Sequence, residues 1–306
     1  MLNYGDASFV PQADPQYCKT EYFDDLQKIL NRNIFFPVMI SGPTGVAKTM
    51  TVEEVCSSLN RELFRVNITI ESDEDSLMGG FRLKNGDTVF DKGPVIRAME
   101  RGAILLLDEI DLGSPSKMMC LQSILEGKGY LIKRTGEYVR PAAGFNIIGT
   151  CNTKGQGDES GLFNATQILN EAMLDRFRIM FEAKFPNEDD EKKILMGYVD
   201  KFSINDDKIE EHVDILVKFA NNVRDTIEKT NDMDHNISTR RLVGIIEGYA
   251  IFGDMEKSLL SSISRFDNHH KETYLKMWKL LLPENKAKQE SEEEDYIKQF
   301  EKIEPF

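Results

Sequence analysis

The clearest chemical pattern in the chain is a set of two glycines, a lysine and a threonine between residues 42 and 49. They have the spacing Gly-x-x-Gly-x-x-Lys-Thr, after an apolar run and directly before a helical pattern. Consecutive backbone N–H groups and the start of a helix can together surround phosphate oxygens. In that context Lys48 would reach the β- and γ-phosphates of a nucleotide, and the Thr49 hydroxyl would bind Mg²⁺. The predicted nucleotide-binding residues are Gly42, Pro43, Thr44, Gly45, Val46, Ala47, Lys48 and Thr49.

Ala47 departs from the general form of this loop, in which a glycine precedes the lysine. Alanine tolerates this position if the backbone there is helical, so the departure weakens the match only slightly. The alternative interpretation of the whole segment is a glycine turn that joins a strand to a helix without binding phosphate.

Acidic and amide side chains end two later apolar runs. Asp108 and Glu109 end the run 103–109, and Asn152 ends the run 145–152. Asp108 would hold the hydration shell of Mg²⁺, and Glu109 would orient the attacking water or accept its proton. Asn152 would orient the same water through its amide. Each of these endings is common alone, but after a phosphate loop they predict nucleotide hydrolysis.

The apolar runs also predict the elements that position these residues. Runs that alternate with helical patterns indicate a parallel sheet in a three-layer α/β domain. Two hairpins interrupt this order, one around Asn85-Gly86 and one around Thr135-Gly136. The predicted strands are 34–41, 63–68, 103–109, 145–152 and 179–185, and the hairpins span 81–90 and 129–140.

The pattern changes after Pro186. Asn187 can cap a helix that begins at Glu188, and further helical patterns follow without a strand. We therefore predict a small all-α domain after the α/β domain, and then a charge-rich tail that stays mobile or serves as a docking peptide. The predicted domains are 1–186 (α/β, nucleotide-binding), 187–283 (helical, with helices near 207–229, 239–251 and 268–281) and 284–306 (acidic tail).

Charge and composition exclude several protein classes. The net charge of −14 disfavours a tight non-specific nucleic-acid binder, which needs a broad basic surface. No apolar run is long enough for a membrane span, and the first residues do not form a secretory signal. The four cysteines lack CxxC spacing and the four histidines form no metal pattern, so we expect a reduced, cytoplasmic protein.

Taken together, these motifs resemble the AAA+ ATPase family. The phosphate loop, with alanine before the lysine, resembles that of the MoxR branch. The two hairpins resemble the inserts of the clade that contains this branch. Three stretches resemble the ATPase subunits of cobaltochelatases (CobS-like proteins), namely 10–17, 123–131 and 149–177. The resemblance covers residues 9–186 well and 187–283 in outline. It implies a P-loop NTPase fold with a helical lid domain.

The resemblance also implies roles for individual residues. Lys48 and Thr49 match the family's phosphate loop, Asp108 and Glu109 its Walker B motif, and Asn152 its sensor 1. Arg176, in the stretch Leu-Asp-Arg-Phe, matches its arginine finger, and Arg240, in Ser-Thr-Arg-Arg, matches its sensor 2 arginine.

Alternatives remain for the arginines. Arg176 could form a surface ion pair with Asp175 or Glu171, and Arg178 is a competing finger. Arg241 could take the place of Arg240. Lys133 and Arg134, near the turn of the second hairpin, could line the pore of a ring or lie at a solvated tip.

The expected function is ATP-driven remodelling of a partner protein. ATP and Mg²⁺ would bind between the α/β domain and the lid, in a homo-oligomeric, hexameric ring where a neighbour's Arg176 completes the site. The resemblance suggests a partner with a VWA-type domain, while the apolar runs and the net charge predict that neither a membrane nor a nucleic acid is a partner. The alternatives are a nucleic-acid motor and a scaffold that uses ATP only to assemble. A GTPase is not expected, because no NKxD motif occurs.

Overall fold

The structure is a computed structural model that describes residues 8–153, 171–230 and 236–283. The chain divides into two compact units, Met1–Lys184 and Phe185–Phe306. The tail 284–306 and most of the stretch 154–170, which carries part of the family resemblance, lie outside the described residues.

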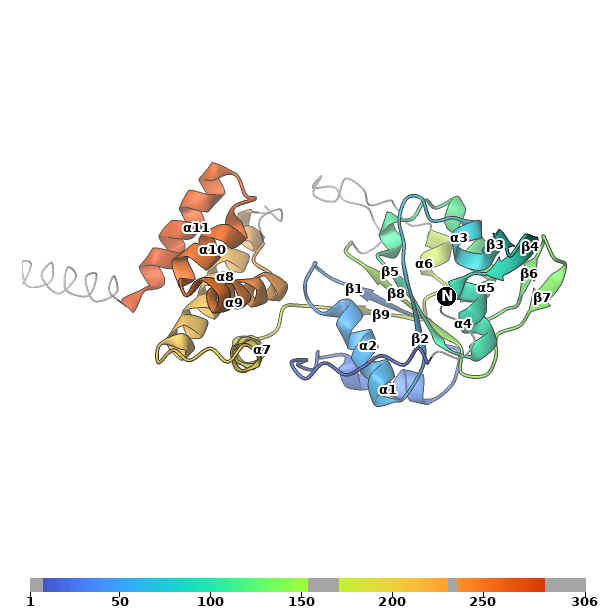
Figure 1. Cartoon of the computed structure of the whole chain (residues 1–306), viewed down its shortest axis with the longest axis horizontal. Coiled ribbons are helices and arrows are strands. Elements are labelled where there is room, and N and C mark those ends of the chain that lie inside the picture. The colour runs from blue at the N-terminus through green and yellow to red at the C-terminus, as the bar shows by residue number, and fades with distance from the viewer. Residues whose placement is uncertain (1–7, 154–170, 231–235, 284–306) are drawn as a thin grey trace, which may run out of the picture. The chain divides into compact units, whose positions relative to one another are not determined.

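A five-stranded sheet forms the centre of the first unit. Its strand order is β2-β5-β8-β1-β9, and every pair of neighbours is parallel (Figure 1). All five predicted strands are therefore confirmed, as is the parallel α/β class. The strands are β1 (Val38–Ser41), β2 (Leu63–Asn67), β5 (Ile104–Asp108), β8 (Asn146–Cys151) and β9 (Ile179–Glu182).

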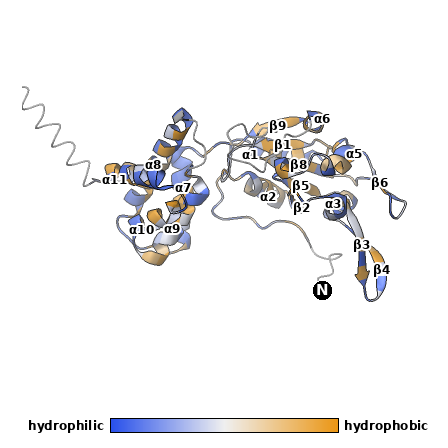
Figure 2. Ribbon diagram, turned by 90° about the horizontal axis from the view of Figure 1, so that it is seen from above, coloured by the Kyte–Doolittle hydropathy of each residue, from blue (hydrophilic) through white to orange (hydrophobic). Residues whose placement is uncertain are grey.

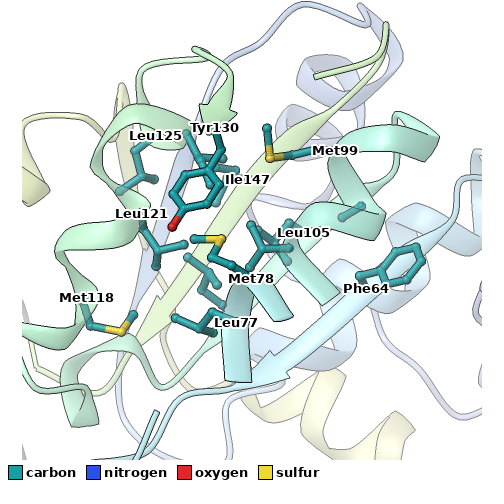
Figure 3. Packing of buried hydrophobic residues seen from close by; sticks show 14 of the residues in the cluster. Phe64, Leu77, Met78, Met99, Leu105, Met118, Leu121, Leu125, Tyr130 and Ile147 are labelled. Atoms are coloured by element: carbon teal, nitrogen blue, oxygen red, sulfur yellow. The ribbon is translucent and has the colours of Figure 1, made fainter. Parts of the chain in front are cut away.

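Alternate residues of the strands pack into two different layers. Leu105 of β5 and Ile147 of β8 join a hydrophobic cluster with Leu77, Met78 and Met99 (Figure 3). The residues that alternate with Leu105 and Ile147 along each strand are equally buried but face the other side of the sheet. The cluster is covered by α3 (Glu74–Met78), α4 (Pro94–Arg101) and α5 (Gln122–Leu125), with the 3-10 turns Ile110–Leu112 and Lys117–Leu121. The opposite face is covered by α2 (Lys48–Ser58), against which α1 (Phe23–Asn31) packs.

Both predicted hairpins are present. β3 (Gly79–Lys84) and β4 (Asp87–Lys92) turn at Asn85 and Gly86, which both have positive φ, as a two-residue hairpin turn requires. This hairpin separates α3 from α4. β6 (Tyr130–Ile132) pairs with β7 (Glu137–Val139). The first hairpin carries three exposed apolar side chains, those of Phe81, Leu83 and Val89. The ribbon of β3 and β4 is partly in the hydrophobic colour in Figure 2.

The second unit consists of helices joined by loops, without a strand among its described residues. The Asn187 side chain accepts a hydrogen bond from the Asp190 N–H at 2.9 Å and caps the first helix, as predicted. One helix, Met255–Ile263, was absent from the prediction. The helices are α7 (Glu188–Lys201), α8 (Ile209–Thr230), α9 (Thr239–Phe252), α10 (Met255–Ile263) and α11 (Asn268–Leu281), while α6 (Glu171–Leu174) belongs to the first unit. No helix in the described part of the chain is long and apolar enough to cross a bilayer.

A buried ion pair joins three helices of this unit. Glu191 of α7 accepts two hydrogen bonds from Arg224 of α8, at 2.7 and 2.8 Å, and one from the Thr239 hydroxyl of α9, at 2.6 Å. The Arg224 Nε also donates to the Ile237 carbonyl oxygen at 2.9 Å. Because these bonds meet on both sides of Ser238, the N-cap of α9, they fix the start of that helix against α7 and α8.

Candidate active site

The phosphate-loop segment connects β1 to α2 at the carboxyl edge of the sheet. At Gly42 a Cβ atom would lie 2.2 Å from the Ala183 carbonyl oxygen, so only glycine fits between the neighbouring strands. Gly45 has φ of 85°, in the left-handed region that glycine adopts freely. The loop geometry therefore needs glycine at both predicted positions.

Ala47 does not have the right-handed helical backbone that alanine tolerates most easily. Ala47 has φ 61° and ψ 24°, in the left-handed region, and it is the N-cap residue of α2. Its carbonyl oxygen accepts hydrogen bonds from the Thr51 N–H and hydroxyl, at 2.8 and 2.9 Å. The backbone changes from a left-handed conformation at Ala47 to the right-handed conformation of α2. Alanine adopts the left-handed conformation at a cost of about 1–2 kcal/mol.

Lys48 and Asn152, predicted as phosphate-loop and sensor residues, are in direct contact. The Lys48 ammonium donates to Asn152 Oδ1 at 2.9 Å and to the carbonyl oxygens of Gly42 and Pro43, at 2.6 and 2.9 Å. The Lys48 side chain is buried, and burial lowers its pKa, while Cys151 and three nearby carboxyl groups act in the opposite direction. A buried cation thus lies between the loop and the end of β8.

Thr49 and Asp108, predicted to bind Mg²⁺, are also in contact. The Thr49 hydroxyl lies 3.0 and 3.1 Å from the two oxygens of the Asp108 carboxylate, with which it forms hydrogen bonds. A hydroxyl and a carboxylate are hard oxygen ligands of the kind that Mg²⁺ prefers, with phosphates and water as its remaining ligands. The described residues contain no cluster of three or more His, Cys, Asp or Glu that could hold a metal ion without a substrate. The donor set fits a nucleotide-bound Mg²⁺.

Two further residues hold Asp108, and sequence reasoning did not identify them. The Thr150 hydroxyl of β8 donates to Asp108 Oδ1. Arg65 of β2 places Nε and a terminal nitrogen 2.9 and 2.7 Å from Oδ2. Both contacts exist because β5 lies between β2 and β8 in the sheet. The Asp108 carboxylate is therefore buried with its orientation fixed from both neighbouring strands.

Glu109 has a strained backbone and an exposed side chain. Its φ of 56° and ψ of 46° are left-handed, and its N–H donates to the Thr150 hydroxyl at 3.0 Å. Such strain at a non-glycine residue costs about 1–3 kcal/mol and is common where a side chain must be aimed. The exposed Glu109 side chain thus follows directly after the end of the strand that carries Asp108.

Asp111 fixes the end of β8, and it too was missed. This fully buried carboxylate accepts hydrogen bonds from the N–H groups of Asn152 and Thr153, at 2.9 and 3.0 Å, and from the Thr153 hydroxyl at 3.1 Å. The position of Asp111, just after Asp108 and Glu109, was a signal that could have identified it, because an Asp in a short turn often binds backbone N–H groups. Through these bonds Asp111 positions Asn152.

Arg176 forms an ion pair within its own chain, but not with the residues considered from the sequence. Its Nε and one terminal nitrogen donate to Glu126 Oε1, at 3.0 and 2.7 Å. No contact within the described residues joins Arg176 to Lys48, Thr49 or Asp108. The side chain of Arg178 is exposed, and its N–H donates to the Pro37 carbonyl oxygen at 2.9 Å.

The arginines of α9 differ in their surroundings. Arg241 donates to the Ser262 carbonyl oxygen and lies over the Phe266 ring, 4.8 Å from its centroid. Burial lowers the pKa of Arg241 to about 10. Arg240 is exposed. Because Arg241 is engaged with other parts of the helical unit, Arg240 is the better candidate to reach a ligand.

The basic residues of the second hairpin also differ. Arg134 is paired with both carboxylate oxygens of Asp75 on α3, at 2.6 and 3.1 Å, whereas Lys133 is exposed. Lys92, at the end of β4, binds Glu137 of β7 at 2.6 Å. The two hairpins are thus tied to each other and to α3 by ion pairs.

Comparisons with known proteins identify the family of the chain. Residues 37–177 match the family described as the AAA domain of the dynein-related subfamily. The chain is 32% identical over 260 residues to the aerobic cobaltochelatase subunit CobS of a Sinorhizobium species, an alignment that covers 82% of this chain and 76% of that protein. It is 29% identical over 231 residues to an uncharacterized protein of Staphylococcus saprophyticus, covering 73% of this chain and 81% of that one.

Solved structures resemble the fold. RuvB of Thermotoga maritima matches with a TM-score of 0.54 at 14% identity, covering 84% of this chain and 73% of RuvB. NtrX of Brucella abortus also matches with a TM-score of 0.54, at 16% identity, covering 78% of this chain and 53% of NtrX. At these identities the likeness concerns the fold alone.

Proposed function

The chain belongs to the AAA family of the dynein-related subfamily and is similar to a CobS protein, and from that premise we propose that it hydrolyses ATP with Mg²⁺ to remodel a partner protein. The observation that carries this proposal is the pair of contacts Lys48–Asn152 and Thr49–Asp108. They bring four predicted site residues, from three separate stretches of sequence, together at one edge of the sheet.

In the proposed reaction the loop N–H groups and Lys48 bind the phosphates of ATP. Thr49 and Asp108 would hold Mg²⁺, which when bound offsets negative charge on the phosphate oxygens. Glu109 orients a water molecule and accepts its proton, and Asn152 donates to or accepts from the same water. Arg240 of the helical unit binds the phosphates from the side of the lid.

The proposed assembly is a homo-oligomeric ring of six subunits, the number that the family resemblance suggests. Arg176 of one subunit would complete the site of its neighbour by stabilising charge on the transferred phosphoryl group. Its position supports this role, because it contacts none of the phosphate-loop or Walker B residues named above within its own chain.

The proposed partner is a protein, for which a VWA-type domain is the candidate from the resemblance. The exposed apolar residues of the first hairpin, Phe81, Leu83 and Val89, support a protein contact there, because exposed apolar groups of this kind mark interaction surfaces. The net charge of −14 disfavours DNA. The four cysteines form no disulfide within the described residues, which fits a reducing, cytoplasmic setting.

Two substitutions test the proposed reaction. We expect Lys48→Ala to lose ATP binding, because it removes the cation at the phosphate loop. Glu109→Gln should bind ATP normally but lose turnover by about 100-fold or more, since the amide cannot accept a proton. Glu272→Gln, an acid-to-amide change at an exposed position of α11, is the control. Normal ATP affinity in Lys48→Ala, or wild-type turnover in Glu109→Gln, would refute the proposed site.

A Glu109→Gln variant also serves to identify the partner. Because it should keep ATP bound, a complex with the partner would persist during purification. Recovery of a VWA-domain protein would support the partner proposal, and recovery of DNA with salt-dependent stimulation of turnover would contradict it.

A further inference from the structure

Glu126 is a charged residue for which the proposed reaction has no role, and it holds the guanidinium of Arg176. Its Oε1 atom accepts hydrogen bonds from Arg176 Nε at 3.0 Å and from a terminal nitrogen at 2.7 Å. Its other oxygen accepts a bond from Lys128 at 2.6 Å. The side chains of Arg176 and Glu126 are 22% and 32% exposed, so the ion pair lies at the surface with both side chains partly covered.

The contacts leave part of the guanidinium available. Arginine has five N–H donors. Two of them bind Glu126, and the other terminal nitrogen of Arg176 donates to the Ala172 carbonyl oxygen. Within the described residues, each terminal nitrogen therefore keeps one N–H for a further acceptor. Glu126 and the Ala172 carbonyl oxygen hold the plane of the guanidinium. The remaining N–H groups of the two terminal nitrogens can still bind a bidentate anion such as phosphate.

The backbone that carries Glu126 is itself fixed. Glu126 ends α5, and the next residue, Gly127, has φ of 73°, which lets the chain reverse direction. The Gly127 and Lys128 N–H groups close the helix by donating to the carbonyl oxygens of Ile124 and Ser123, both at 2.9 Å. A Cβ atom at Gly127 would lie 2.8 Å from the Phe35 ring. The carboxylate is thus presented from a rigid helix end.

The carboxylate is ionised at neutral pH. The ammonium of Lys128 and the guanidinium of Arg176 both lower the pKa of Glu126. A permanent negative charge next to Arg176 keeps that side chain folded back along α6 rather than extended into solvent, which reduces the entropy lost when it meets a phosphate.

We propose that Glu126 is a positioning residue for Arg176 and that it acts on the active site of the neighbouring subunit. This inference rests on the proposed finger role of Arg176. Glu126 would not touch ATP. It would set the direction from which the guanidinium approaches the phosphates, where a misplacement on the order of 1 Å can cost about 100-fold in rate.

A subunit-mixing experiment with the full-length protein tests this. We expect Glu126→Gln to assemble and to bind ATP within about two-fold of wild type, but to turn over about 10- to 100-fold more slowly. Mixed with Lys48→Ala, it should recover activity, because intact phosphate loops then meet well-positioned fingers. Mixed with Arg176→Ala, it should not, because both variants lack a competent finger. Lys128→Met is the control: it removes the other partner of Glu126 and should stay within about two-fold of wild-type turnover.

Other outcomes would overturn the inference in distinguishable ways. If Arg176→Ala loses turnover while Glu126→Gln does not, the positioning role is wrong and the finger role stands. If Glu126→Gln is rescued by Arg176→Ala but not by Lys48→Ala, it acts on its own subunit's site. If light scattering shows that Glu126→Gln does not assemble, Glu126 serves assembly instead. Normal turnover of Arg176→Ala would remove both the finger and the inference.

Discussion

Thr150 links the two carboxylate residues that we assign to magnesium and water. Its hydroxyl donates to Asp108 and accepts from the Glu109 N–H. Thr150→Val keeps the size of the side chain but leaves the Glu109 N–H without this acceptor. We expect the free energy of unfolding to fall by about 1–3 kcal/mol and turnover to fall more than ATP affinity. Thr150→Ser keeps the hydroxyl and is the control, so equal turnover of the two variants would contradict the role.

The left-handed backbone of Ala47 gives a prediction with the opposite sign. Ala47→Gly removes the steric penalty at φ 61° and should raise the free energy of unfolding by about 1 kcal/mol, with ATP affinity retained. Ala47→Val should lower it, because a β-branched residue is poorly accommodated at positive φ. Urea unfolding of both variants provides the measurement. A more stable valine variant would show that the backbone at this position is not left-handed.

The sequence predicted some site residues and not others for a physical reason. Lys48, Asp108 and Asn152 lie at the ends of strands or the start of a helix, where local patterns locate them. Arg65 and Thr150 lie inside strands, and their contacts with Asp108 depend on the order β2-β5-β8. Strand order is a property of the whole sheet, and the local pattern of one strand does not specify it.

At the scale of elements, the Glu191–Arg224 pair connects α7, α8 and α9. Arg224→Met leaves a buried carboxylate without its partner, so we expect the helical unit to lose about 3–5 kcal/mol of stability. Adding Glu191→Leu should recover most of this loss. The chain has a single tryptophan, Trp278, which is buried in this unit, and its fluorescence therefore reports the unfolding of the helices. Unchanged unfolding of Arg224→Met would contradict the structural role.

Element boundaries show where local sequence patterns are insufficient. The predicted strand 34–41 is shorter in the structure, beginning at Val38, because Pro37 has no N–H to donate to a neighbouring strand. The helix Met255–Ile263 was missed, although Asp254 caps it by accepting from the Lys257 N–H at 2.9 Å. It follows α9 after only Gly253 and Asp254, and Gly253 ends α9 with a left-handed backbone.

At the scale of the whole molecule, the motifs were sufficient to place the chain in its family, and the comparisons confirmed that placement. Short local signals sufficed because phosphate binding imposes a fixed loop geometry. The partner and the ring were not accessible in the same way, since they depend on surfaces that no local motif defines.

The ring proposal predicts that activity depends on concentration. Turnover per subunit should rise with protein concentration as rings form, because each site needs an arginine from a neighbour. Steady-state ATPase assays over a dilution series, with light scattering at each concentration, provide the measurement. Concentration-independent turnover of a proven monomer would contradict the ring.

The most direct test of the account mixes two inactive variants, Lys48→Ala and Arg176→Ala. Each should have little turnover alone, the first because it does not bind ATP and the second because it lacks the finger. In mixed assemblies an intact Arg176 meets an intact phosphate loop at shared interfaces, so the mixture should recover a substantial part of wild-type turnover. If the variants co-assemble, as shown by co-purification of differently tagged chains, and the mixture remains inactive, the site is not shared between subunits.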